Sequence, residues 1–268
     1  MRLLLLLLAA CTTTPADTDT DTGTASDTAS DSGTETDTER TDLAHFTGAV
    51  MDDAGAPLDG ARVSVCRAIC RTQTVDSTGL FDFQVEPETH SIHVEPPHDQ
   101  SVAHASALFP LTFAANEERD VTVTLPLAGT PRPLPTGAAA ELDLDGVLLT
   151  LQDGDLAVAL SPDPVLQVSG ARLAPELYPP LQLDGDVLAV WYLSPYNAGS
   201  NAGVPVAIAL EPGVVTGGEA LRLWRADYAT FSWVDDGEVL ANSDGTRLEG
   251  SALLHGLTTL ALVRTPAP

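Results

Sequence analysis

Two cysteines lie close enough in the sequence to react with each other. Cys66 and Cys70 are separated by three residues. Along one straight strand their Cα atoms would be about 13 Å apart, well beyond the roughly 4.4 to 6.8 Å that a disulfide allows. We therefore expect the chain to turn back between them in a hairpin closed by a disulfide, which contributes about 2 kcal/mol to stability. The alternatives are two free thiols or a redox-active pair, although the spacing differs from the C-x-x-C of thiol oxidoreductases.

Four of the six histidines lie between His90 and His104, and such a clustering is one mark of a metal site. His90 and His93 are three residues apart, so on one strand their side chains point to opposite faces. His98 follows two prolines in a loop, and no H-E-x-x-H motif occurs. We therefore expect solvated histidines, with no metal and no other cofactor.

Sequence motifs for catalysis are absent. No G-x-S-x-G elbow, phosphate-binding loop or zinc-binding helix occurs. Asp-Gly-Asp occurs at 153–155 and at 184–186, but each offers fewer oxygen ligands than a calcium loop needs, so calcium binding stays a minor alternative. The sequence predicts that the protein is not an enzyme.

The third cysteine, Cys11, follows one arginine and an apolar run that ends in two alanines. A basic residue, an apolar stretch and small residues at a cut site make up a secretory signal, and this stretch is too short to span a bilayer. Residues 8–11, Leu-Ala-Ala-Cys, resemble a bacterial lipobox, which implies removal of residues 1–10 and a lipid anchor on Cys11. An ordinary signal peptide is the alternative. Thr12, in place of Asp, resembles the sorting pattern for the outer membrane of Gram-negative bacteria.

The charge balance excludes one class of function. The chain has 38 acidic and 12 basic residues, for a net charge of −26, and every basic residue is arginine. Nucleic-acid binding requires a basic surface, so we exclude it. The absence of lysine also removes Schiff-base chemistry and a lysine general base.

Residues 11–41 are predicted to form a lipidated, disordered tether. Thr, Asp, Ser, Ala, Gly and Glu dominate residues 12–41, with no aromatic residue and no Val, Ile or Leu. Such a segment cannot bury enough apolar surface to offset its ordering entropy. As a flexible coil it would span about 30 Å. A stalk for O-glycans or weak calcium binding are the alternatives to a plain spacer.

Residues 42–127 show short period-two runs bounded by turn residues, which predicts a β-sandwich. The segment 48–63, GAVMDDAGAPLDGARV, and the segment 76–83, DSTGLFDF, resemble the carboxypeptidase regulatory-like domain. The resemblance implies a transthyretin-like sandwich of about seven strands that acts as an accessory module and is not itself a peptidase. It covers about a third of the chain.

A second β-sandwich is predicted beyond a linker. Residues 128–137 carry too many prolines and glycines for a helix or strand. In residues 138–268, apolar runs of strand length alternate with Asp-Gly turns, which favours about eight strands and an all-β chain of two sandwich domains. We expect few contacts to cross the linker, and each half to keep its own core.

The predicted function is that of a non-catalytic lipoprotein at the cell surface, whose sandwiches serve envelope structure or contact with a protein partner. A carbohydrate-binding module is the first alternative. It would need exposed aromatic platforms, for which Trp191, Tyr192, Tyr178 and Tyr196 are the candidates. A secreted enzyme is the second alternative.

Overall fold

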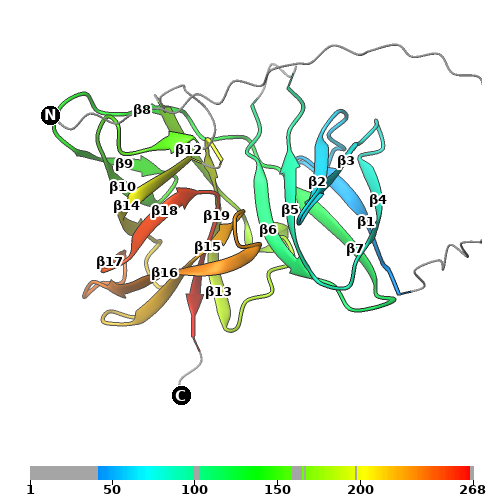
Figure 1. Cartoon of the computed structure of the whole chain (residues 1–268). Helices are drawn as coiled ribbons and strands as arrows, with labels where there is room; N and C mark the ends of the chain where they lie inside the picture. The colour runs from blue at the N-terminus through cyan, green and yellow to red at the C-terminus, as the bar shows by residue number, and fades with distance from the viewer. Residues whose placement is uncertain (1–41, 99–102, 159–164, 166, 197, 266–268) are drawn as a thin grey trace, which may run out of the picture. The chain divides into compact units, whose positions relative to one another are not determined.

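The structure is a computed structural model that describes residues 42–98, 103–158, 165, 167–196 and 198–265 (Figure 1). These residues are almost entirely β-structure, with one short 3-10 helix, η1 (Pro175–Leu177), which confirms the predicted all-β fold. The predicted signal, the lipidation site Cys11 and the tether lie outside the described residues. Among the residues described, no helix has the length and apolarity needed to cross a membrane.

The N-terminal sandwich, residues 42–127, consists of two sheets packed face to face. One has the order β4-β1-β7 and the other β3-β2-β5-β6, and β1 is parallel to β7. The strands are β1 (Ala44–Met51), β2 (Arg62–Cys66), β3 (Cys70–Thr74), β4 (Leu80–Val85), β5 (Thr89–Glu95), β6 (Ala107–Thr112) and β7 (Glu118–Thr124). Seven strands is the number that the resemblance to the carboxypeptidase regulatory-like domain implies, while membership of that family stays a prediction.

The alternation of apolar and polar residues determines which face of a strand packs into the core of this sandwich. In β4, Phe81, Phe83 and Val85 are buried, whereas the residues between them are exposed. This is the pattern of a strand with one face on the core. The ring of Phe46 on β1 lies 5.1 Å from that of Phe81 on β4 of the same sheet. It also lies 5.2 Å from the ring of Phe113, which follows β6 of the other sheet, so this second contact joins the two sheets.

The hairpin of β2 and β3 confirms the predicted disulfide. Cys66 and Cys70 are directly opposite each other in the antiparallel register, with their Cα atoms 4.0 Å apart, and a disulfide joins them. Residues 67–69 form the turn. The bond therefore closes the hairpin at its tip.

The C-terminal region, residues 128–265, is built on one twelve-stranded sheet. Its main path is β8-β12-β13-β19-β15-β16-β17-β14-β10-β9, and both β11 and β18 pair with β14. Twelve strands exceed the eight or so that we expected. The strands are β8 (Arg132–Pro133), β9 (Ala140–Leu144), β10 (Val147–Leu151), β11 (Ala157–Val158), β12 (Gln167–Arg172), β13 (Asp186–Ser194), β14 (Ala198–Ala209), β15 (Ala220–Asp227), β16 (Ser232–Ala241), β17 (Arg247–Gly250), β18 (Leu253–Leu257) and β19 (Thr259–Arg264).

Strands β13 and β19 are buried on both faces. Trp191 and Leu262 belong to the core of the C-terminal region, whereas their neighbours Tyr192 and Ala261 belong to the cluster that fills the N-terminal sandwich. The apolar runs of these two strands are unbroken because a strand that lies between two cores has no face in contact with solvent.

The core of the N-terminal sandwich therefore extends onto β13 and β19, so the expectation of a separate core is wrong for the N-terminal half, whereas the C-terminal region has a second core of its own. Strand β6 contacts β15, β16 and β19 (Figure 1). The backbone N–H of Leu108 on β6 donates a buried hydrogen bond of 3.0 Å to the hydroxyl of Thr259 on β19. The linker also packs: β8 pairs with β12, and Gly129 approaches Gly170 so closely that a Cβ would lie 2.2 Å from its carbonyl oxygen.

Candidate functional site

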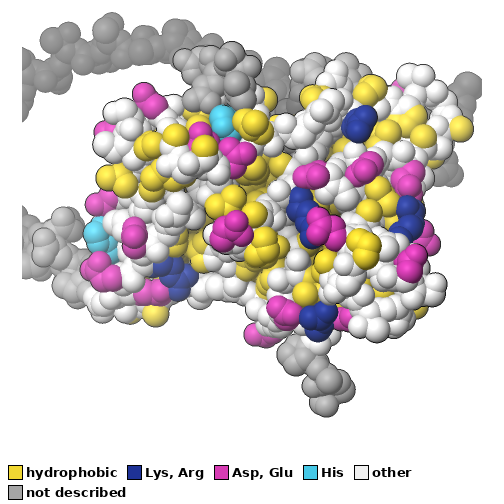
Figure 2. Space-filling view, turned by 180° about the vertical axis from the view of Figure 1, so that it is seen from behind, with side chains coloured by type: hydrophobic (Ala, Val, Ile, Leu, Met, Phe, Trp, Pro, Cys, Tyr) yellow, Lys and Arg dark blue, Asp and Glu magenta, His cyan; other side chains and the backbone are white. Residues whose placement is uncertain are grey.

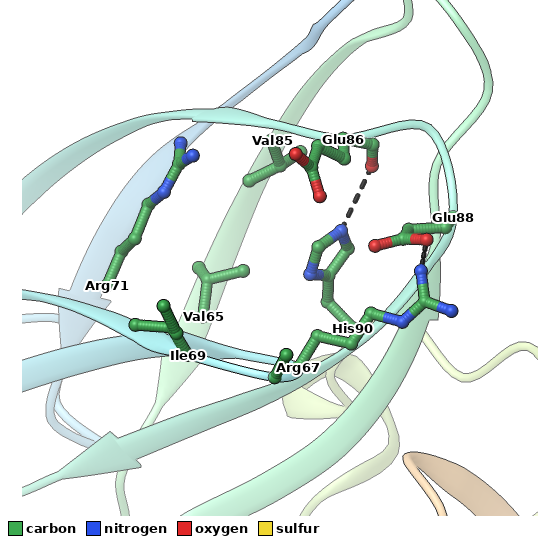
Figure 3. Close-up of a pocket in the computed structure, with 9 residues that line it drawn as sticks. Val65, Arg67, Ile69, Arg71, Val85, Glu86, Glu88 and His90 are labelled. Atoms are coloured by element: carbon green, nitrogen blue, oxygen red, sulfur yellow. Dashed lines mark hydrogen bonds and ion pairs between the residues drawn. The ribbon is translucent and has the colours of Figure 1, made fainter.

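A pocket of about 440 Å³ lies at the disulfide end of the N-terminal sandwich (Figure 3). It lies between the β2–β3 hairpin and the turn that joins β4 to β5. Its floor is apolar, with Val65 and Val85 both buried, and charged side chains surround it. The pocket is lined by Val65, Arg67, Ala68, Ile69, Arg71, Val85, Glu86, Glu88 and His90.

Each charged group at the rim has a defined partner or environment. Arg67 forms an ion pair with Glu88, which joins the hairpin to the β4–β5 turn (Figure 3). The ring of His90 donates from Nε2 to the carbonyl oxygen of Glu86 at 3.0 Å. Burial lowers the pKa of His90, so this imidazole is neutral at pH 7. No Ser, Thr or Tyr lines the pocket, and the disulfide removes both thiols as nucleophiles. The pocket therefore combines an apolar floor with charged and hydrogen-bonded groups at its rim.

Side chains of β3 cover the neighbouring edge of β4. The guanidinium of Arg71 donates to the carbonyl oxygen of Gln84 at 2.5 Å, and the side-chain oxygen of Gln73 accepts from the N–H of Asp82 at 3.0 Å. An open strand edge would invite pairing with another chain. These backbone groups of β4 are therefore already bonded within the chain.

Ile69 is the most exposed large apolar side chain among the described residues, at 82%. It lies in the turn between the two cysteines, where the disulfide restricts the backbone. Exposing such a side chain to water is unfavourable. The hairpin is predictable from the sequence, whereas Ile69 was not among the predicted site residues. The signal for it was an apolar residue in the short turn between two cysteines.

The histidines are placed differently from our expectation. His90 and His93 are buried on β5, at 6% and 5% exposure, so the expectation of solvated histidines is wrong for both. The ring of His93 lies 4.0 Å from that of Tyr196 and has Nε2 3.9 Å from a carboxylate oxygen of Glu95. The residues described contain no group of three or more His, Cys, Asp or Glu side chains placed to hold a metal ion.

The aromatic residues that could serve as glycan platforms are also placed differently. Trp191 and Tyr192 point to opposite faces of β13, as predicted, but both are completely buried. Tyr178 and Tyr196 are partly exposed on separate segments. The four residues therefore form no common platform.

A buried ion pair links two strands in the C-terminal region. The guanidinium Nε of Arg225 donates to the carboxylate of Asp236 at 2.9 Å, and its Nη1 donates to Asp227 at 2.9 Å. Burial raises the pKa of Asp236, against the effect of the arginine. All three groups lie on β15 and β16, so the cluster ties adjacent strands together.

On the face shown in Figure 2, Asp and Glu side chains are spread out and do not gather in one patch, and few basic side chains lie among them. Such a distribution favours solubility.

No protein-family model and no curated protein matches the chain. Among solved structures, the Bacillus anthracis TIE protein is similar over 78% of this chain, with 6% identity and a TM-score of 0.27, and this chain spans 44% of its length. A Bacteroides uniformis protein, for which carbohydrate binding is itself only suggested, is similar over 82% of this chain and 79% of its own, with 11% identity and a TM-score of 0.22. At these TM-scores neither similarity carries an argument.

Proposed function

We propose that the protein is a non-catalytic binding module, held at the envelope surface by a lipid on Cys11, whose disulfide-closed hairpin contacts another envelope protein. The observation that carries this proposal is the exposure of Ile69 on a hairpin closed by the Cys66–Cys70 bond. An apolar anchor held in one conformation loses little entropy on binding.

The partner surface is expected to be apolar and acidic. Ile69 and Ala68 offer apolar contacts. Arg71 lines the same pocket, and its guanidinium donates a hydrogen bond to a backbone carbonyl oxygen. The side chain of Arg67 is 48% exposed. A partner that inserts an apolar side chain into the pocket and places a carboxylate against Arg71 would match this surface.

The first experiment tests the anchor. Cys11→Ala is expected to leave the precursor uncleaved and without lipid, because both steps of lipoprotein processing use that thiol. Metabolic labelling with palmitate followed by membrane fractionation measures the outcome, and the wild type is expected in the outer membrane. Label incorporated into the variant would contradict the lipid anchor, and wild-type protein in the inner membrane would contradict the sorting.

The second experiment tests the hairpin contact. A photo-crosslinking residue at position 69 is expected to give one discrete product with an envelope protein in intact cells. Position 240 is the matched control. Leu240 has the same size as Ile69 and is 50% exposed, but it lies on β16 and does not line the pocket. Arg71→Ala is expected to reduce the product at position 69 by at least about fivefold.

A third experiment tests whether the contact depends on the disulfide that closes the hairpin. Cys66→Ser with Cys70→Ser is expected to lower stability by about 2 kcal/mol and to weaken crosslinking at position 69. Equal products at positions 69 and 240, or none at position 69, would contradict the proposed contact.

A further inference from the structure

A second pocket, of about 320 Å³, lies where strands of both regions meet, apart from the hairpin. Strand β6 lies beside β15 and β16 at this junction (Figure 1). The lining residues come from β5, β6, β15, β16 and the segment before β13, and they are Thr89, Pro110, Thr112, Gln182, Leu183, Asp184, Trp224, Ser232 and Trp233. The volume falls within the range of small-molecule sites.

Two tryptophans share one face of the sheet at this pocket. In the β15–β16 register Trp224 is opposite Asp235, and Trp233 is opposite Ala226. Because residues two apart in a strand share a face, Trp224 and Trp233 are diagonal neighbours on the same side. Both rings are partly exposed and both line the pocket.

The tryptophans present carbon, and not their N–H groups, to the pocket. Both indole Nε1 atoms are fully buried, and neither has a hydrogen-bond partner among the described residues. The exposed part of each ring therefore consists of ring carbons. Such a surface favours contact with the C–H groups of a ligand, because the contact removes apolar surface of both from water.

Polar groups surround this apolar surface in fixed positions. The side chain of Gln182 accepts from the N–H of Thr112 at 2.6 Å and donates to its carbonyl oxygen at 3.1 Å, which holds residues 181–184 against β6. The hydroxyls of Thr89 and Thr112 are 2.8 Å apart. Asp184 is exposed and is the one charged residue in the lining. The pocket thus combines an aromatic surface, hydroxyl groups and one carboxylate.

We propose that this pocket binds a neutral saccharide. The C–H face of one sugar unit stacks on the ring carbons of Trp224 and Trp233, and its hydroxyls donate to the carboxylate of Asp184. A cationic ligand could also use the tryptophans and the carboxylate. One hydroxyl of the Thr89–Thr112 pair donates to the other, and the second hydroxyl keeps a proton that it can donate to a sugar oxygen. This favours the sugar, because a cation accepts no hydrogen bond.

The test is titration of the purified full chain with cellohexaose, maltohexaose, laminarihexaose, xylohexaose and chitohexaose, each up to about 10 mM. Calorimetry measures binding, and tryptophan fluorescence reports where it occurs. The chain has three tryptophans and Trp191 is completely buried, so a change in emission reports Trp224 or Trp233. Saturable binding of at least one sugar with a change in emission is the expected result.

Variants place the binding in this pocket. Trp224→Ala is expected to weaken binding at least about tenfold and Trp224→Phe less, because phenylalanine keeps an aromatic face. Asp184→Asn is expected to weaken it about fivefold without affecting folding, since the side chain is exposed. Asp153→Asn is the matched control, because Asp153 is an exposed residue of the other Asp-Gly-Asp turn and lines none of the pockets described.

Three results would overturn the proposal. The first is the absence of binding by all five sugars. The second is binding that survives both Trp224→Ala and Asp184→Asn. The third is binding of tetramethylammonium, with loss on Asp184→Asn, while no sugar binds, which would make the pocket a cation site.

Discussion

Tyr192→Ala is expected to lower the free energy of unfolding by about 3 to 5 kcal/mol, the range for removing a large buried aromatic side chain. Tyr192 has no exposed surface and lies in the cluster shared by the N-terminal sandwich and the C-terminal region. Its loss leaves a cavity between the two regions. Urea unfolding of the full chain, followed by circular dichroism and by tryptophan fluorescence, measures the change.

Tyr192→Phe is the matched control, and it is expected to raise the free energy of unfolding where Tyr192→Ala lowers it. The hydroxyl of Tyr192 is buried without a hydrogen-bond partner among the described residues, and burial raises its pKa. Removing a buried unpaired hydroxyl is expected to raise stability by about 1 kcal/mol. A loss of more than about 1 kcal/mol in this variant would show that the hydroxyl is bonded. A loss below that size in Tyr192→Ala would show that the regions do not depend on the shared cluster.

Acidification is expected to destabilise the protein through His93. Burial lowers the pKa of His93 from 6.5 to about 4, against the opposing effect of the Glu95 carboxylate. Below pH 6.5 the unfolded chain takes up a proton that the folded protein accepts only near pH 4. Stability is therefore lost as the pH falls through this window, by at most about 3 kcal/mol, and the effect levels off below it.

His93→Phe isolates this contribution. Phenylalanine keeps a ring against Tyr196 and removes the titration, while the Arg62–Glu95 ion pair, 3.2 Å long, stays in place. His90, whose pKa burial also lowers, titrates in both proteins and cancels in the comparison. Urea unfolding at pH 7 and pH 4.5 is expected to show a smaller loss of stability for the variant, by about 2 to 3 kcal/mol. Equal losses in both proteins would show that His93 is accessible to protons in the fold.

Much of the fold could be predicted because its signals are local. The period-two alternation in β4 and the turns around Asp-Gly pairs depend only on neighbours in the sequence. The disulfide was also predictable, because a spacing of four leaves only a sharp turn between Cys66 and Cys70.

Other strands could not be predicted, because their hydrogen bonds come from distant partners. Strand β12 (Gln167–Arg172) lies between β8 and β13, and β9 (Ala140–Leu144) pairs with β10. Both strands consist mostly of polar or small residues and contain no apolar run, so the sequence pattern does not identify either as a strand. The strand structure of the proline-rich linker likewise depends on the edge of β12, which it meets only after folding.

The candidate sites show the same division. The hairpin pocket is partly local, because Ile69 and Arg71 belong to a single hairpin. The second pocket is not: it joins Thr89, Gln182 and Trp233, which lie far apart in the sequence. Nothing in the sequence distinguishes Trp233, which borders a pocket, from Trp191, which is completely buried.

The sequence alone thus determined an all-β chain, a disulfide-closed hairpin and a strongly negative net charge, since each follows from composition or from residues a few positions apart. Whether β13 faced water was decided only by the tertiary structure. The N-terminal sandwich covers one of its faces and the C-terminal core the other, so Tyr192 is buried against residues more than 60 positions away in the sequence. Burial depends on which surfaces meet after folding, and that is a property of the whole chain.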